Sequence, residues 1–112
     1  MKAVFIELPP FERHRSDYLD DLSVKELQRD LMENPDRGDR IQGTGGLRKL
    51  RFKGKGKGRR GGLRIIYYWF VDGQQFWLFT LYSKGEMADL TEDEKRVLKQ
   101  LLEHEKAQRG GR

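Results

Sequence analysis

Basic side chains are concentrated in one stretch of this sequence and point to a site for negative charge. Nine Lys or Arg and no Asp or Glu occur from Arg48 to Arg64, although the whole chain of 112 residues has a net charge of only +5. The rest of the chain is therefore net −4, and the positive field is local. A loop kept charged only for solubility normally mixes both signs. The stretch therefore favours a surface for a polyanion such as a nucleic acid.

This basic stretch divides into a strand and a loop. Alternation over Leu47–Phe52 predicts a strand with Lys49 and Arg51 together on one face. The loop Lys53–Gly62 is spaced by glycines and matches neither a Walker A sequence nor a dinucleotide fingerprint, which disfavours nucleotide hydrolysis. We expect the loop to follow an RNA backbone without sequence preference. The predicted RNA- and ribosome-binding residues are Arg48, Lys53, Lys55, Lys57, Arg59 and Arg60.

A predicted hairpin brings Arg64 to the end of the following strand. The two apolar strands, Leu63–Val71 and Phe76–Tyr82, flank a turn signal at Asp72-Gly73. A two-residue turn pairs Arg64 with Leu81, and a four-residue loop pairs it with the residue two further on. Both registers place Arg64 beside the end of the second strand. The strand with Lys49 and Arg51 precedes Leu63–Val71, and if these two strands also pair as a hairpin, both basic residues end near Arg64. The predicted cluster is then Lys49, Arg51, Arg64, Tyr82 and Lys84.

The cluster has no carboxylate pair, no nucleophile–His pair and no metal ligands, which excludes most hydrolytic schemes. It suits RNA cleavage, because the RNA 2′-hydroxyl can itself attack the adjacent phosphate if a protein orients the strand and stabilises the added charge. Arg64 would hold the phosphate through its planar donors. Neighbouring cations lower the pKa of a lysine, so Lys49 or Lys84 could accept the proton. Tyr82 could orient the hydroxyl or stack on a base.

Simpler interpretations exist for each of these residues taken singly. Arg64 could be an ordinary charge at the start of a strand, and Tyr82 a core aromatic with its hydroxyl at the rim. Glu86, the nearby acid, is expected to pair with Lys84 or Lys49 rather than act as the general base. The convergence of the residues, and not any one of them, favours a site.

The composition predicts neither a cofactor nor a metal centre. The chain has no Cys and only His14 and His104, so we expect no disulfide, no thiolate site and no zinc centre built from imidazoles. The N-terminus lacks the features of a signal peptide, and no stretch approaches the roughly 20 apolar residues of a membrane span. We therefore expect a soluble cytoplasmic protein without membrane contact.

The remaining patterns predict a single α+β domain over residues 1–112. A strand over Ala3–Glu7 precedes a helix with Pro10 in its first turn. A capping box at Ser23-Val24-Lys25-Glu26 predicts a second helix that ends at Asn34-Pro35, and another at Thr91–Glu94 opens a C-terminal helix. The expected order is β-α-α-β-β-β-α: two N-terminal helices packed on a small, mostly antiparallel, twisted sheet that the first strand joins by a crossover.

Several strings taken together resemble the HigB branch of the RelE/ParE toxin superfamily, over nearly the whole chain. They are Gly43–Arg51, the glycine-spaced Gly54–Gly62, Arg64–Tyr68 and Leu81–Thr91. The resemblance implies the toxin of a type II toxin–antitoxin system: an endonuclease that enters the ribosomal A site, cuts translated mRNA and is silenced by a helix-turn-helix, HigA-like antitoxin. It also assigns the phosphate-contacting arginine to Arg64, the paired basic residues to Lys49 and Arg51, and the basic residue after the last strand to Lys84.

The sequence departs from the family pattern near its end. RelE has an arginine just after that last lysine and a tyrosine in its C-terminal segment, where this chain has Gly85 and a residue near Thr91. Tyr82 is a candidate substitute for the tyrosine. The superfamily includes ParE proteins, which share the fold but poison gyrase. A gyrase-directed toxin, or a module that only binds RNA or the ribosome, is therefore the alternative.

Overall fold

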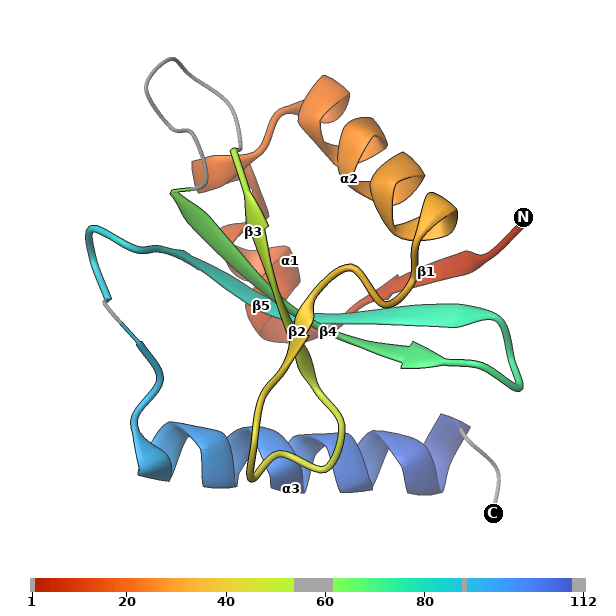
Figure 1. Ribbon diagram of the computed structural model, residues 1–112, viewed down its shortest axis with the longest axis vertical. Coiled ribbons are helices and arrows are strands. Elements are labelled where there is room, and N and C mark those ends of the chain that lie inside the picture. The colour runs from red at the N-terminus through yellow and green to blue at the C-terminus, as the bar shows by residue number, and fades with distance from the viewer. Residues whose placement is uncertain (1, 54–61, 88, 110–112) are drawn as a thin grey trace.

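The computed structural model describes residues 2–53, 62–87 and 89–109 as three helices around a five-stranded sheet (Figure 1). The sheet order is β1-β5-β4-β3-β2, with β1 parallel to β5 and every other neighbouring pair antiparallel. The elements are β1 (Val4–Glu7), α1 (Pro9–Tyr18), α2 (Asp21–Glu33), β2 (Asp39–Arg40), β3 (Arg48–Phe52), β4 (Leu63–Phe70), β5 (Gln75–Ser83) and α3 (Glu92–Arg109). The predicted α+β architecture is confirmed, with the short edge strand β2 as an addition.

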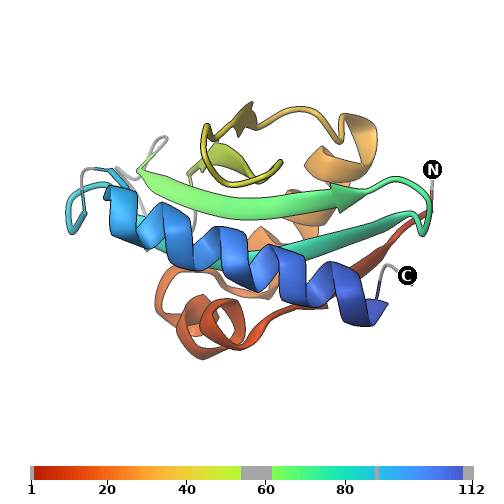
Figure 2. The ribbon, with the colours of Figure 1, turned by 90° about the horizontal axis from the view of Figure 1, so that it is seen from below.

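Each face of the sheet carries its own hydrophobic core. Side chains of α1 and α2, among them Phe11 and Leu27, pack with Ile65 of β4 on one face. On the other face, Leu98 of α3 packs with Ile66. Figure 2 shows α3 lying along one side of the sheet, as this division requires. The central strand β4 is thus covered on both faces, as its nearly continuous apolar sequence predicts.

The helix starts follow local capping chemistry, with one correction to the sequence prediction. Thr91 and Glu94 form the predicted capping box of α3, each side chain accepting from the backbone N–H of the other at 3.1 and 2.8 Å. The predicted cap at Ser23 is wrong: α2 begins earlier, and the Asp20 carboxylate accepts from the Ser23 N–H at 2.8 Å. Aspartate at this position also favours the positive end of the helix.

The β4–β5 hairpin follows the first predicted register near its turn and leaves it at a bulge. Phe70 pairs with Gln75 across a loop of residues 71–74, in which Gln74 has a φ of 51°. The register then shifts between Ile66 and Tyr67, where a bulge adds one residue to β5. Beyond the bulge, Arg64 therefore pairs with neither Leu81 nor Ser83 but with the residue between them.

Two further features position the site. The crossover through α1 and α2 leads from β1 to the opposite edge of the sheet, and Val4 of β1 pairs with Gln75 of β5. Tyr67 anchors the loop before β2: its hydroxyl donates to the Pro35 carbonyl at 2.7 Å and accepts from the Gly38 N–H at 3.0 Å.

None of the described helices is both long and apolar enough to cross a membrane.

Candidate functional site

Arg51, Arg64 and Tyr82 form a row across three neighbouring strands. Arg51 of β3 pairs with Arg64 of β4, and Arg64 pairs with Tyr82 of β5. Directly opposed residues share a face of the sheet and have Cβ atoms about 5 Å apart. Tyr82 packs in the α3-side core, so the row lies on the α3 face. Three of the five residues predicted to cluster are thereby brought side by side.

Lys49 belongs to the next row of the same face. It pairs with Ile66 of β4 and lies two residues from Arg51 along β3, a separation of about 7 Å. Its ammonium contacts the Asp89 carboxylate, with Nζ and Oδ1 3.3 Å apart. The loop between β5 and α3 therefore reaches the strand that carries Lys49. Asp89 was missed by sequence reasoning, since nothing in the string Met87–Leu90 links it to a strand so distant in the chain.

The row combines buried and exposed groups. Arg51 is exposed, whereas Arg64 is only 7% exposed and its Nη1 donates to the Leu63 carbonyl at 3.1 Å. Tyr82 is 5% exposed, and its buried hydroxyl has no hydrogen-bond partner among the described residues. Two like charges directly opposed across strands disfavour the fold. A bound anion would relieve that repulsion, and its oxygens could engage the free hydroxyl.

The charges around the row affect the acid–base properties of its neighbours. Burial raises the pKa of Tyr82; the Asp89 and Glu94 carboxylates raise it further, and the Arg64 guanidinium opposes them. The pKa of Asp89 is lowered, first because its carboxylate accepts from the Leu90 N–H at 2.9 Å, then through Lys49. At neutral pH the site thus contains a neutral phenol that the Arg64 guanidinium and the Asp89 and Glu94 carboxylates influence in opposite directions.

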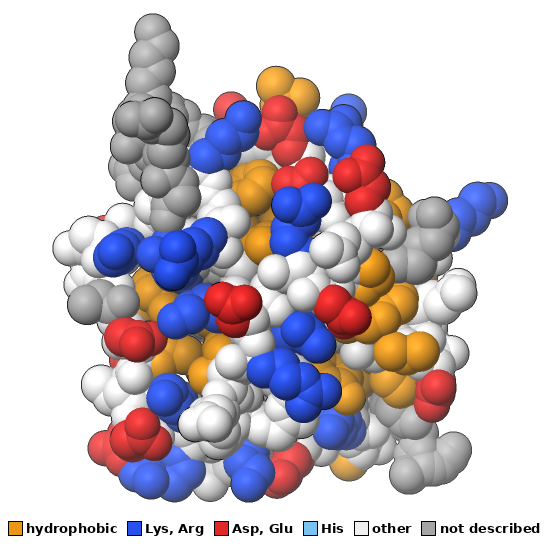
Figure 3. Space-filling model, in the orientation of Figure 1, with side chains coloured by type: hydrophobic (Ala, Val, Ile, Leu, Met, Phe, Trp, Pro, Cys, Tyr) orange, Lys and Arg blue, Asp and Glu red, His pale blue; other side chains and the backbone are white. Residues whose placement is uncertain are grey.

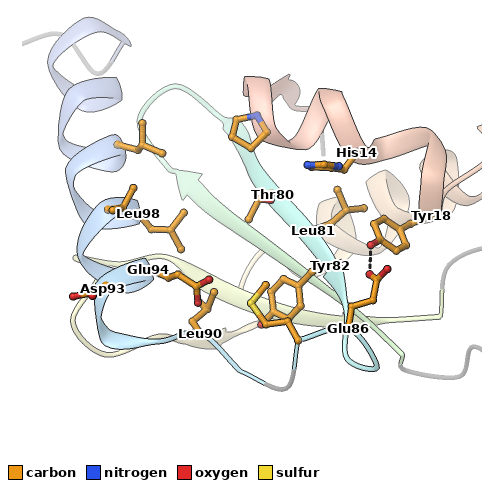
Figure 4. A pocket seen from close by; sticks show the side chains of 14 residues that line it. His14, Tyr18, Thr80, Leu81, Tyr82, Glu86, Leu90, Asp93, Glu94 and Leu98 are labelled. Carbon is orange, nitrogen blue, oxygen red and sulfur yellow. Dashed lines mark hydrogen bonds between the residues drawn. The ribbon is translucent and has the colours of Figure 1, made fainter.

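The other two predicted participants lie differently from expectation. Lys84 is exposed just after β5, where its backbone N–H donates to the Gly62 carbonyl at 2.7 Å. No hydrogen bond or ion pair within the described chain joins its ammonium to the other cluster members. Glu86 was expected to pair with Lys84 or Lys49, and this is wrong: its carboxylate accepts from the Tyr18 hydroxyl of α1. This contact, drawn in Figure 4, ties the loop to α1 instead.

A groove of about 730 Å³ lies between α1 and the first half of α3. Figure 4 shows Leu81 and Tyr82 at its base, with Leu90 and Glu94 to one side and the Tyr18–Glu86 pair to the other. Apolar side chains dominate the lining, including that of the exposed Val97. Tyr82 is thus shared between the basic row and this groove.

The predicted RNA-binding residues are only partly described. Arg48 turns away from the row: its guanidinium donates to the Gly38 carbonyl at 2.8 Å and pairs with Asp36 at 3.4 Å. Lys53 is exposed just past β3. Figure 3 shows Lys and Arg interspersed with Asp and Glu on one face of the molecule. The remaining predicted contacts, Lys55, Lys57, Arg59 and Arg60, lie outside the described residues.

No metal centre is offered by the part of the chain that the structure describes, where no three His, Cys, Asp or Glu side chains gather into a ligand set. The row and Lys49 bring together three cations and a phenol, with the Asp89 carboxylate on Lys49. Such donors can hold and stabilise an oxyanion through charge-assisted hydrogen bonds. These donors suit a reaction at a phosphodiester whose own substrate provides the nucleophile, as the 2′-hydroxyl of RNA does.

Comparison with solved structures identifies the fold. The chain is similar to the Escherichia coli toxin RelE, solved in the free state as a variant with two arginines replaced by alanine. The TM-score is 0.52 at 12% sequence identity, and the match covers 79% of this chain and 90% of that one. This protein therefore has a RelE-like fold. No protein-family model matches the sequence.

Proposed function

We propose that this protein is the toxin of a type II toxin–antitoxin system and cuts translated mRNA in the ribosomal A site. The row Arg51–Arg64–Tyr82, with Lys49 beside it, carries the proposal. The RelE-like fold supports it, since RelE is itself a toxin. The sequence resemblance to HigB-type toxins adds the ribosome, the mRNA and a HigA-like antitoxin as partners, and a cytoplasmic location.

The proposed reaction uses the RNA as its own nucleophile. The 2′-oxygen loses its proton and bonds to the adjacent phosphorus while the bond to the 5′-oxygen breaks, and that oxygen is protonated. Arg64 and Arg51 would donate to the nonbridging phosphate oxygens, which gain charge in the transition state. Lys49 would contribute a further positive charge from the next row, and Tyr82 would donate its hydroxyl to the RNA.

Lys84 has a peripheral place in this scheme. Its ammonium extends from the exposed turn after β5, and Gly62 pairs with its backbone. The proposal assigns it to the entering strand, either as a contact to a flanking phosphate or as a proton carrier. Its loss should therefore lower cleavage less than loss of Arg64.

Arg64 needs rearrangement before it can clamp a phosphate fully, because it is 7% exposed. Its hydrogen bond to the Leu63 carbonyl holds the side chain on the α3 face of the sheet. Docking on the ribosome is the event that we propose turns the guanidinium towards the RNA. Dependence on the ribosome would follow directly, since free RNA alone would meet a mostly covered arginine.

The experiment compares growth arrest and mRNA 5′ ends in cells that express the wild type or single variants. Arg64→Ala and Arg51→Ala should each lower cleavage by about 100- to 1,000-fold, the usual effect of losing one donor to a transition-state oxyanion. Arg51 is exposed, so its variant tests the site without disturbing the core. Arg40→Ala, an exposed arginine on the edge strand β2, is the matched control.

The outcomes separate the proposal from its main alternative. Growth arrest without new RNA ends would favour a ParE-like toxin directed at gyrase, which shares the fold. Full toxicity in an Arg64→Ala and Lys84→Ala double variant would exclude the assigned catalytic residues. If new RNA ends appear equally on untranslated RNA, the protein is a nuclease but its cleavage does not depend on the ribosome.

A further inference from the structure

Asp89 is an acidic side chain that pairs with Lys49, the lysine beside the basic row. It lies on the loop that follows β5, yet its carboxylate reaches β3 and contacts the Lys49 ammonium at 3.3 Å. Each of its described neighbours in sequence faces elsewhere: Glu86 bonds Tyr18, and Leu90 packs against the α3-side core. The loop therefore delivers one negative charge to the row.

The electrostatics place this carboxylate close to the rest of the site. Asp89 and Arg64 act on the Tyr82 phenol with opposite sign, so both charges lie near its ring. The Asp89 side chain is 67% exposed, whereas that of Lys49 is 28% exposed. The carboxylate is thus the more exposed partner of the pair, and solvent reaches it readily.

A carboxylate and a phosphodiester present the same chemistry to an ammonium, namely anionic oxygens that accept hydrogen bonds. Lys49 cannot give its full charge to both. We propose that Asp89 is an internal competitor that occupies the position of an RNA phosphate on Lys49 and so sets how tightly this site holds RNA. The inference rests on the proposed function, because it assumes that the row binds RNA.

The interaction of an exposed ion pair is weak enough for Asp89 to act as such a competitor. Exposed pairs contribute little to stability, so a phosphate that also meets Arg51 and Arg64 can displace the carboxylate. The Leu90 backbone N–H, which does not belong to the row, donates to the Asp89 carboxylate at 2.9 Å and holds it nearby. Once displaced, Asp89 therefore stays close enough to return when the RNA leaves.

The test measures binding of an RNA that cannot be cut. A fluorescein-labelled oligonucleotide with 2′-O-methyl groups lacks the attacking hydroxyl, so its anisotropy reports binding alone. Asp89→Asn should tighten binding by about two- to fivefold, the gain expected from removing one exposed ion-pair competitor. Asp72→Asn is the matched control, with the same charge change at an exposed position in the β4–β5 loop. Asp89→Glu should bind like the wild type.

Repeating the measurement in a Lys49→Met protein identifies the cause of any tighter RNA binding. In that protein Asp89→Asn should change RNA affinity no more than Asp72→Asn does, because the Lys49 ammonium for which Asp89 and the phosphate compete is absent. An equal gain from both substitutions, an unchanged gain without Lys49, or weaker binding by Asp89→Asn would each overturn the inference. Thermal unfolding of every variant verifies that the fold is retained.

The outcomes also separate the inference from the proposed function. If Arg51→Ala weakens oligonucleotide binding but Asp89→Asn does not change it, only the proposed role of Asp89 as a competitor is overturned. Absence of binding by the wild type and by Asp89→Asn at low salt overturns both the competitor and RNA binding at this row. Cleavage on the ribosome, measured separately, is not part of this test.

Discussion

Arg64 and Tyr82 face each other directly across β4 and β5. The extra residue at the bulge is what places them so: a regular hairpin continued from the turn would set Leu81 opposite Arg64. The bulge instead turns Leu81 into the core on the α1 and α2 face and brings the Tyr82 phenol to the α3 face. One inserted residue therefore exchanges an aliphatic neighbour of Arg64 for a group that can donate a hydrogen bond.

Tyr82→Phe should separate the stability of the fold from its activity. The Tyr82 hydroxyl is buried without a hydrogen-bond partner in the described part of the chain, and an unsatisfied buried hydroxyl costs about 1 to 3 kcal/mol. Its removal should therefore leave the free energy of unfolding unchanged or raise it by about 1 kcal/mol. Cleavage should fall if the phenol donates to the RNA. Denaturant unfolding and the mRNA cleavage assay measure the two effects.

Tyr67→Phe is the comparison for this prediction. The Tyr67 hydroxyl has two partners, the Pro35 carbonyl and the Gly38 N–H, so its loss should destabilise the protein by about 1 to 3 kcal/mol. Equal destabilisation by both substitutions would contradict the assignment of Tyr82 as an unsatisfied hydroxyl.

Stability should fall at alkaline pH. Burial is the main reason that the pKa values of Tyr67 and Tyr82 are both raised above the ordinary 10.0. A phenol whose pKa is higher in the folded than in the unfolded protein stabilises the fold fully below pH 10 and loses that contribution as the pH rises through the folded pKa. Thermal unfolding from pH 8 upwards should show the loss beginning near pH 10. Tyr82→Phe should flatten the curve, whereas a curve unchanged in both Tyr→Phe variants would exclude this cause.

The start of α2 offers a test between two caps. Asp20→Ala should lower the free energy of unfolding by about 1 kcal/mol, since it removes the acceptor of the Ser23 N–H. Ser23→Ala keeps that hydrogen bond, because the serine contributes its backbone, and should change stability less. The reverse order would restore the capping box at Ser23 that the sequence suggests.

Gly38 has no room for a side chain. A Cβ there would lie 2.8 Å from the Tyr67 ring and 3.0 Å from the Lys49 carbonyl oxygen. Gly38→Ala should therefore destabilise the protein by about 1 to 3 kcal/mol through overpacking. Gly85→Ala, where the same atom would meet only Ser83 Oγ at 3.6 Å, should be close to neutral. Chemical denaturation of the two variants provides the measurement.

The sequence predicts the elements well where one signal dominates. The apolar run of β4, a proline in the first turn of α1 and the Thr91–Glu94 box each rest on local chemistry, and the structure retains all three. At Ser23 two local signals compete, because Asp20 can cap the same turn. The aspartate is used, and the helix begins at Asp21.

The site is predictable only as far as pairing follows from the turn. The hairpin brings Arg64 near the end of β5 in any register, but the bulge that selects Tyr82 depends on packing of both sheet faces at once. Contacts across the loop after β5 depend on tertiary structure alone. For that reason Glu86 was matched with the wrong partner and Asp89 with none.

The parallel pairing of Val4 with Gln75 has a consequence for the order in which a growing chain can fold. The β3–β4–β5 ladder consists of local antiparallel pairings, whereas β1, synthesised first, must wait for β5 to emerge before it gains a neighbour. Until then the apolar faces of α1 and α2 have no finished sheet to cover. A nascent chain therefore passes most of its synthesis without a complete row, since Tyr82 is among the last strand residues to be made.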